Sequence, residues 1–151
     1  MSLIDKLRAG IAAGREELTN QVSRYKNRKF LEGTVAICVG VGMASDGVAT
    51  EEKQKMLGFI KASPELKVFD TNEVIEIFNK LISSFDFDLD VGKGEVVKLV
   101  MRLKDNKDEL QLALRVGIAV AKSDGDFDQA EQNYIKNLCV SVGLNPADFD
   151  L

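Results

Sequence analysis

The sequence predicts an all-α fold, a compact single domain (residues 1–151) of seven to eight helices. Apolar residues recur at helical spacing along nearly the whole chain. Strand-like alternation occurs only at 85–90, where Phe85, Phe87 and Leu89 alternate with aspartates. We interpret this stretch as a connector whose apolar side chains anchor in the core and whose carboxylates face water. The length of 151 residues, 45% of them hydrophobic, suits one domain with a buried core.

Each expected helix follows from its apolar pattern and its flanking residues. Gly14 closes a short amphipathic stretch, after which helices are expected over 15–29 and 30–45. The second of these is apolar on nearly all sides, so it must be buried. A helix over 51–62 stops before Pro64, because proline cannot continue a helix. The remaining expected elements are helices over 70–84, 92–104, 107–122 and 129–142, and a terminal turn opened by Pro146.

An internal repeat appears when residues 13–62 are aligned with 91–140. Apolar positions keep their phase across three helices, and the Ser-Asp-Gly sequence at 45–47 falls on the one at 123–125. We therefore predict two similar three-helix halves, joined by the helix over 70–84 and related by an approximate two-fold axis. The nearly all-apolar helix of each half is expected at the centre of the molecule.

Composition excludes several classes of function. Histidine is absent, which removes His-dependent catalysis and His-ligated zinc or haem. The net charge of −4 disfavours nucleic acid as a partner. The basic stretch 24–29 is expected to form a solvated face, with contact to an anionic lipid surface as the alternative. Cys38 and Cys139 lie inside apolar runs and are expected to be buried thiols. No signal peptide or membrane span is apparent, so we expect a cytoplasmic protein.

Two Asp-Gly turns follow the two apolar helices, and each leads into an acidic helix start. The turns lie at 45–52 (SDGVATEE) and 123–131 (SDGDFDQAE). Helix capping alone explains much of this pattern, with glycine ending one helix and Thr50 or Asp128 acting as the N-cap of the next. On this interpretation no ligand is needed.

The functional interpretation is that the oxygens of these turns converge on a divalent cation. Oxygen-only ligands favour a hard ion such as Ca²⁺, Mg²⁺ or Mn²⁺. The spacing is not that of an EF-hand. The candidate metal ligands are Asp46, Glu51, Glu52, Asp124, Asp126, Asp128 and Glu131.

Several longer runs resemble the TerB family of bacterial tellurite resistance proteins. They are GREEL (14–18), RYKN (24–27), ASDGV (44–48), LKVFD (66–70), FDFDL (85–89) and LALRVGIAVAKSDG (112–125). The resemblance implies a TerB-like helical fold, similar to the amino-terminal region of the DjlA co-chaperone. It also implies a cytoplasmic stress-response protein at the inner face of the membrane, near the membrane protein TerC, that chelates metal through acidic residues. Lys53 departs from the family pattern, because it stands where Glu131 supplies an acid in the second half.

We therefore expect a non-enzymatic accessory protein of tellurite resistance that binds a divalent cation and other components of the system. No organic cofactor is expected. The alternative is a pure interaction module, because residues 46–90 carry a net charge of −5 beside +3 for residues 1–45. A third hypothesis is a carboxylate-dependent hydrolase or a tellurite reductase, for which the sequence offers no positioned base and only two buried thiols.

Overall fold

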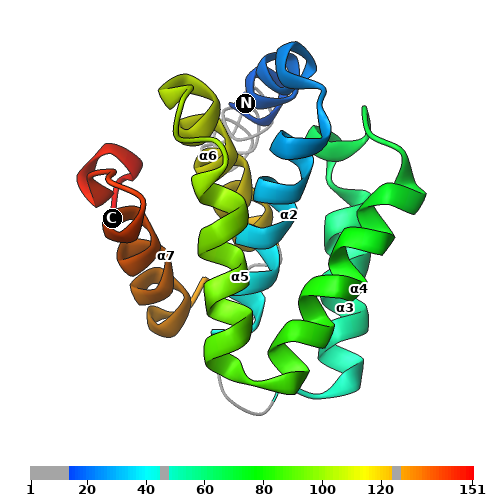
Figure 1. Ribbon diagram of the computed structural model, residues 1–151. Helices are drawn as coiled ribbons and strands as arrows, with labels where there is room; N and C mark the ends of the chain where they lie inside the picture. Colours follow the sequence, from blue (N-terminus) through cyan, green and yellow to red (C-terminus); the bar gives the residue numbers. More distant parts are fainter. Residues whose placement is uncertain (1–13, 45–47, 124–126) are drawn as a thin grey trace, which may run out of the picture.

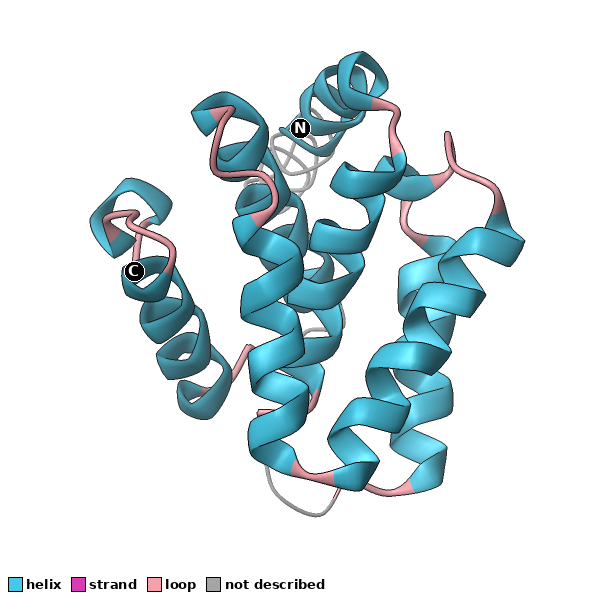
Figure 2. Cartoon of the chain, viewed as in Figure 1, coloured by secondary structure: helices cyan, strands magenta, loops and turns pink. Residues whose placement is uncertain are grey.

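The computed structural model describes residues 14–44, 48–123 and 127–151. Within these ranges the chain is helical and contains no strand (Figure 2), which confirms the predicted all-α class. The α-helices are α2 (Arg28–Gly42), α3 (Thr50–Ala62), α4 (Thr71–Phe87), α5 (Leu89–Met101), α6 (Lys107–Ser123) and α7 (Gln129–Ser141), and residues 14–22 are also helical. Three 3₁₀ turns complete the order: η1 (Ser23–Tyr25), η2 (Pro64–Leu66) and η3 (Pro146–Phe149).

Helix α2 lies in the middle of the bundle and contacts α3, α4, α5, α6 and α7 (Figure 1). Its side chains are buried from Phe30 to Val41 except for Glu32, as expected for a helix that is apolar on nearly all sides. Helix α6 packs closely against it, because Gly117 of α6 leaves room for the fully buried Ile37 of α2. The predicted central position of the first apolar helix is thus confirmed, and the second apolar helix, α6, packs against it. The two-fold relation between the halves stays a prediction.

The predicted helix over 15–29 is wrong at its carboxyl end. The helical residues 14–22 pass into η1, and the chain then breaks at Lys26 and Asn27. The reason is a capping interaction, because the Asn27 side chain accepts a hydrogen bond of 2.9 Å from the Phe30 backbone N–H and so begins α2. Asparagine at this position ends one helix and starts the next, which apolar periodicity alone does not detect.

The predicted connector at 85–90 is also shorter than expected. Helix α4 continues to Phe87, and Asp88 alone separates it from α5. The Asp88 carboxylate caps α5 by accepting from the Asp90 and Val91 backbone N–H groups. Because the stretch is helical, its side chains do not alternate between two faces. Phe85 is buried as expected, whereas Phe87 is 83% exposed.

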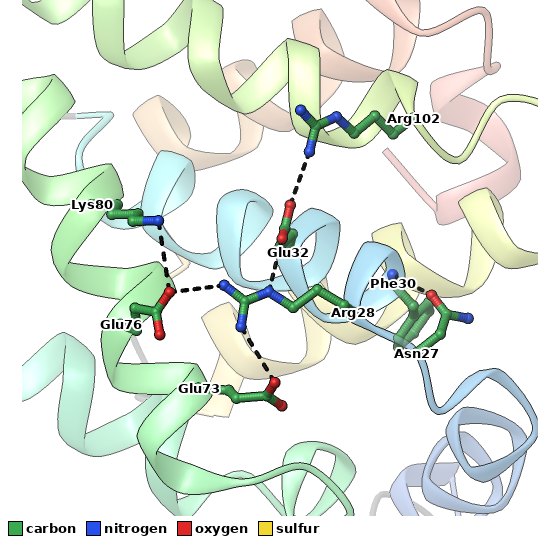
Figure 3. A network of polar contacts seen from close by, with 8 residues as sticks. All are labelled: Asn27, Arg28, Phe30, Glu32, Glu73, Glu76, Lys80 and Arg102. Carbon is green, nitrogen blue, oxygen red and sulfur yellow. Dashed lines mark hydrogen bonds and ion pairs between the residues drawn. The ribbon is translucent and has the colours of Figure 1, made fainter.

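A network of ion pairs on the surface joins α2 to α4 and to the end of α5 (Figure 3). The Arg28 guanidinium contacts Glu32 at 2.9 Å, Glu73 at 3.3 Å and Glu76 at 3.0 Å, and Glu32 also contacts Arg102 at 3.1 Å. The hydrogen bonds to Glu32 and Glu76 raise the pKa of Arg28. Arg28 belongs to the basic stretch expected as a solvated face, whose four basic residues are exposed, and its charge is also engaged by three carboxylates.

Replacing Arg28 with methionine is expected to lower the free energy of unfolding by about 1 kcal/mol or less. The side chain is 39% exposed, so water and salt screen its ion pairs. Chemical unfolding in low salt and in high salt checks this, and the difference between Arg28→Met and the parent should shrink in high salt. A loss of several kcal/mol that salt leaves unchanged would contradict a surface role.

A second ion pair is buried and attaches residues 14–22 to η2. The side chain of Glu65 is fully buried and accepts hydrogen bonds from Arg15 Nε at 2.7 Å, Arg15 Nη2 at 2.8 Å and Ser63 Oγ at 2.6 Å. Burial by itself would raise the pKa of Glu65, but the hydrogen bonds from Arg15 and Ser63 outweigh burial and hold the pKa below its ordinary value. Because Arg15 and Glu65 are far apart in the sequence, apolar periodicity does not indicate this pair.

Candidate functional site at the acidic end

One pocket, of about 670 Å³, is lined by residues where α2 ends and where α3 and α7 begin. These helix ends lie on the lower side of Figure 1. We call this pocket the acidic pocket. Its polar lining consists of Glu52, Lys55, Asp128 and Glu131. Its other lining residues are Cys38, Val41, Gly42, Val48, Met56, Phe59, Ile60, Val120 and Ala121. As far as the described residues show, the pocket is therefore an apolar hollow lined by three carboxylates and one ammonium group.

The structure brings together part of the predicted set of metal ligands. Glu52 from the first half lines the same pocket as Asp128 and Glu131 from the second half. Glu51 is exposed and does not line the pocket. The other three predicted ligands lie outside the described residues: Asp46, Asp124 and Asp126.

The helix starts that carry these carboxylates differ in their capping. Asp128 is the N-cap of α7, as predicted, because its carboxylate accepts a hydrogen bond of 2.8 Å from the Glu131 backbone N–H. The predicted cap at Thr50 is wrong. Ala49 occupies the N-cap position of α3 without a side-chain hydrogen bond, and Thr50 is already the first helical residue. The acidic first turn of α3 still offsets its unpaired backbone N–H groups.

Lys53 in the first turn of α3 has an ion-pair partner on α4. Its ammonium group lies 2.6 Å from an Asp86 carboxylate oxygen. Lys53 therefore neutralises an aspartate of the acidic stretch at 85–90. This pair holds the start of α3 against the end of α4. It leaves Glu52 as the carboxylate of the α3 first turn that faces the pocket.

The apolar side of the pocket was missed as a functional feature, because the sequence pattern assigned its residues to the core. Phe59 is 42% exposed, and Met56 is only partly buried. Met56 packs over Gly42, where an added Cβ would collide with its thioether. The sequence at 51–62 does contain a signal for this apolar side. On a helix, Met56 and Phe59 lie one turn apart, and Glu52 and Lys55 lie one turn before them on the same side.

Comparison with known proteins identifies the family. The family model described as "Tellurite resistance protein TerB" matches residues 31–151. The chain is also 63% identical, over 118 residues, to "Tellurium resistance protein TerB" from Alcaligenes sp. The aligned region covers 78% of this chain and 97% of that relative. The chain belongs to the TerB family. No solved structure matches the chain.

Both cysteines of this TerB-family chain are buried. Burial raises the pKa of Cys38 to about 12 and that of Cys139 to about 11. Both thiols therefore stay protonated at neutral pH, and a protonated thiol is a poor nucleophile and a poor metal ligand. Cys38 contributes to the pocket as an apolar lining group.

The TerB-family match begins at residue 31, so Arg15 precedes it and the buried pair with Glu65 attaches the preceding segment to the matched part. In the described ranges no helix is both long enough and apolar enough to cross a membrane. Among the same residues, no group of three or more Asp, Glu or Cys side chains is arranged to hold a metal ion. Glu52, Asp128 and Glu131 can contribute a negative potential at the pocket, and a complete cation site needs further oxygen ligands.

Proposed function

We propose that this chain serves in tellurite resistance as a non-enzymatic accessory protein that works by binding at its acidic end. Membership of the TerB family supports the cellular role. The observation that carries the binding role is the shared pocket, which collects carboxylates from helix starts almost eighty residues apart. The protonated, buried thiols and the absence of histidine support a role other than nucleophilic catalysis.

The first ligand that we propose is a divalent cation, Ca²⁺, Mg²⁺ or Mn²⁺. The carboxylates of Glu52, Asp128 and Glu131 would supply hard oxygen ligands, and Asp46, Asp124 and Asp126 would complete the set from the two turns. The N-termini of α3 and α7 carry partial positive charge and therefore repel a cation. Several carboxylates are needed to make the local potential negative. This requirement fits the number of acidic residues in the two turns.

Titration with Ca²⁺ or Mg²⁺, followed by amide NMR, tests the cation. We expect saturable shifts confined to residues 44–52 and 123–131. The paired change Asp124→Asn with Glu131→Gln should weaken binding by about tenfold or more, because each loses a charged ligand. A matched control, Asp105→Asn with Asp148→Asn, removes the same charge from surface positions that do not line the pocket. Scattered shifts, or equal affinity for both variants, would overturn the cation site.

The second candidate function is docking of a partner protein without a metal. The apolar lining of the pocket favours docking, because a hard cation is bound by oxygen ligands and gains nothing from the exposed Phe59 or the partly buried Met56. Partners proposed from the family are other tellurite resistance components, including the membrane protein TerC, which would bring the chain to the cytoplasmic face of the membrane. Co-purification with such components that is indifferent to chelator supports docking alone, whereas its loss with chelator supports the cation.

A further inference from the structure

We infer that the acidic pocket is the docking site of a basic amphipathic helix from a partner protein. The inference deepens the docking part of the proposed function and names the chemistry of the partner. It rests on three features of the pocket, namely its size, the order of its apolar and charged groups, and the adaptability of its wall.

The size of the pocket suits a ligand with several apolar groups. Its volume of about 670 Å³ lies within the usual range for binding pockets, roughly 300–1,000 Å³. Val41, Ile60 and Val120 come from three different helices and are buried, so they form a fixed apolar floor. Phe59 leaves 42% of its surface in contact with water at the side of this floor. Covering that surface is favourable, and the burial supplies the driving force for docking.

The charges lie on opposite helices around this floor. Glu52 belongs to α3, whereas Asp128 and Glu131 belong to the start of α7. Among the described residues that line the pocket, Lys55 is the one basic residue. A ligand with an apolar stripe between two rows of Lys or Arg matches this order, and an amphipathic helix with basic flanks has that surface. An acidic ligand would meet three carboxylates, and like charges brought together in an interface cost binding energy.

The wall of the pocket can adjust to such a stripe. Met56 packs over Gly42, so its long thioether side chain has no Cβ beneath it at that point. Methionine is unbranched and fits irregular apolar surfaces, which makes it common where helices dock in grooves. The anchors of a docked helix, spaced at i, i+3 or i+4, and i+7, would contact Met56 and Phe59 while their basic neighbours reach Glu52 and Glu131.

A tryptophan reporter tests the inference, because the chain has no tryptophan of its own. Phe59→Trp places the reporter on the pocket. Val140→Trp is the matched control, because Val140 is 68% exposed on α7 and does not line the pocket. The probes are three 18-residue peptides: an amphipathic Leu/Lys helix, the same composition in scrambled order, and an amphipathic Leu/Glu helix. We expect a saturable blue shift only when the Leu/Lys helix meets the Phe59→Trp protein.

Calorimetry on the unmodified chain, in chelator, gives the affinity without a reporter. The triple variant Glu52→Gln, Asp128→Asn and Glu131→Gln should bind the Leu/Lys helix at least about tenfold more weakly. A control triple variant, Glu16→Gln, Asp105→Asn and Asp148→Asn, should bind as the parent does. Equal binding of the scrambled or acidic peptide, a shift only at Val140→Trp, or parental affinity of the first triple variant would overturn the inference. Because the chelator removes divalent cations, a failure of the peptide to bind would overturn the docking inference without affecting the cation proposal. The metal titration described above tests the cation proposal separately.

Discussion

Replacing Glu65 with alanine should lower the free energy of unfolding by about 3 kcal/mol, which is the scale for removing one partner of a buried ion pair. The substitution leaves the Arg15 guanidinium, whose side chain is only 27% exposed, and the buried Ser63 hydroxyl without their acceptor. Chemical unfolding measures the loss. Glu73→Ala is the matched control, because that carboxylate is about half exposed and its removal should cost little. Equal losses for the two variants would contradict the assignment of Glu65 as a buried structural acid.

The same carboxyl group gives a pH dependence of known sign. The pKa of Glu65 is lower in the folded chain than its unfolded value of about 4.3. Ionised Glu65 therefore stabilises the fold above that value, and the contribution is lost as the pH falls from about 4.3 through the folded pKa. The stability difference between the parent and Glu65→Gln should be constant near neutral pH and should shrink in acid. A gap that widens in acid would show that the sign is wrong.

Replacing Gly117 with alanine should also destabilise the fold, by about 1–3 kcal/mol, because the added methyl group overpacks the contact between α6 and α2. The new Cβ would collide with Ile37, which is fully buried and cannot move aside without displacing α2. Gly58→Ala is the matched control. Nothing lies within 4 Å of a Cβ at Gly58 on α3, so alanine there should stabilise the helix by about 1 kcal/mol.

Chemical unfolding of the two variants therefore tests the helix packing through opposite signs. If Gly117→Ala raised the stability as Gly58→Ala is expected to do, α2 and α6 could not lie as close as described. Circular dichroism on both variants checks that each keeps its helical content before the unfolding curves are compared.

Much of the helical architecture was predictable because burial imposes a period of 3.6 on the sequence. The apolar stretch at 30–45 predicted the central helix, and Asp128 was correctly predicted as the N-cap of α7. The boundaries depended on single side chains that periodicity does not describe. Asn27 caps α2. Asp88 separates α4 from α5, and the alternating residues around it had suggested a connector where α4 ends and α5 begins.

The candidate site was predictable only in its acidic half. Two similar turns in the sequence indicated that carboxylates from both halves matter, and Glu52, Asp128 and Glu131 do line one pocket. The partners of Lys53 and Glu65 are more than thirty residues away in the sequence, so no local pattern indicates either pair. Phe59 and Met56 also looked like core residues, because an apolar helix face has the same pattern whether a neighbouring helix covers it or a pocket leaves it open.

The most direct test of the acidic pocket is a complementation experiment. A bacterial host that lacks this chain is given defined variants of it, and the tellurite resistance of the host is measured. Glu52→Gln with Asp128→Asn and Glu131→Gln removes three charges, and asparagine keeps the cap of α7. Glu16→Gln with Asp105→Asn and Asp148→Asn removes the same number elsewhere. At equal protein abundance, resistance should be lost with the first variant and kept with the second. Parental resistance from the first variant would contradict a functional role of the pocket.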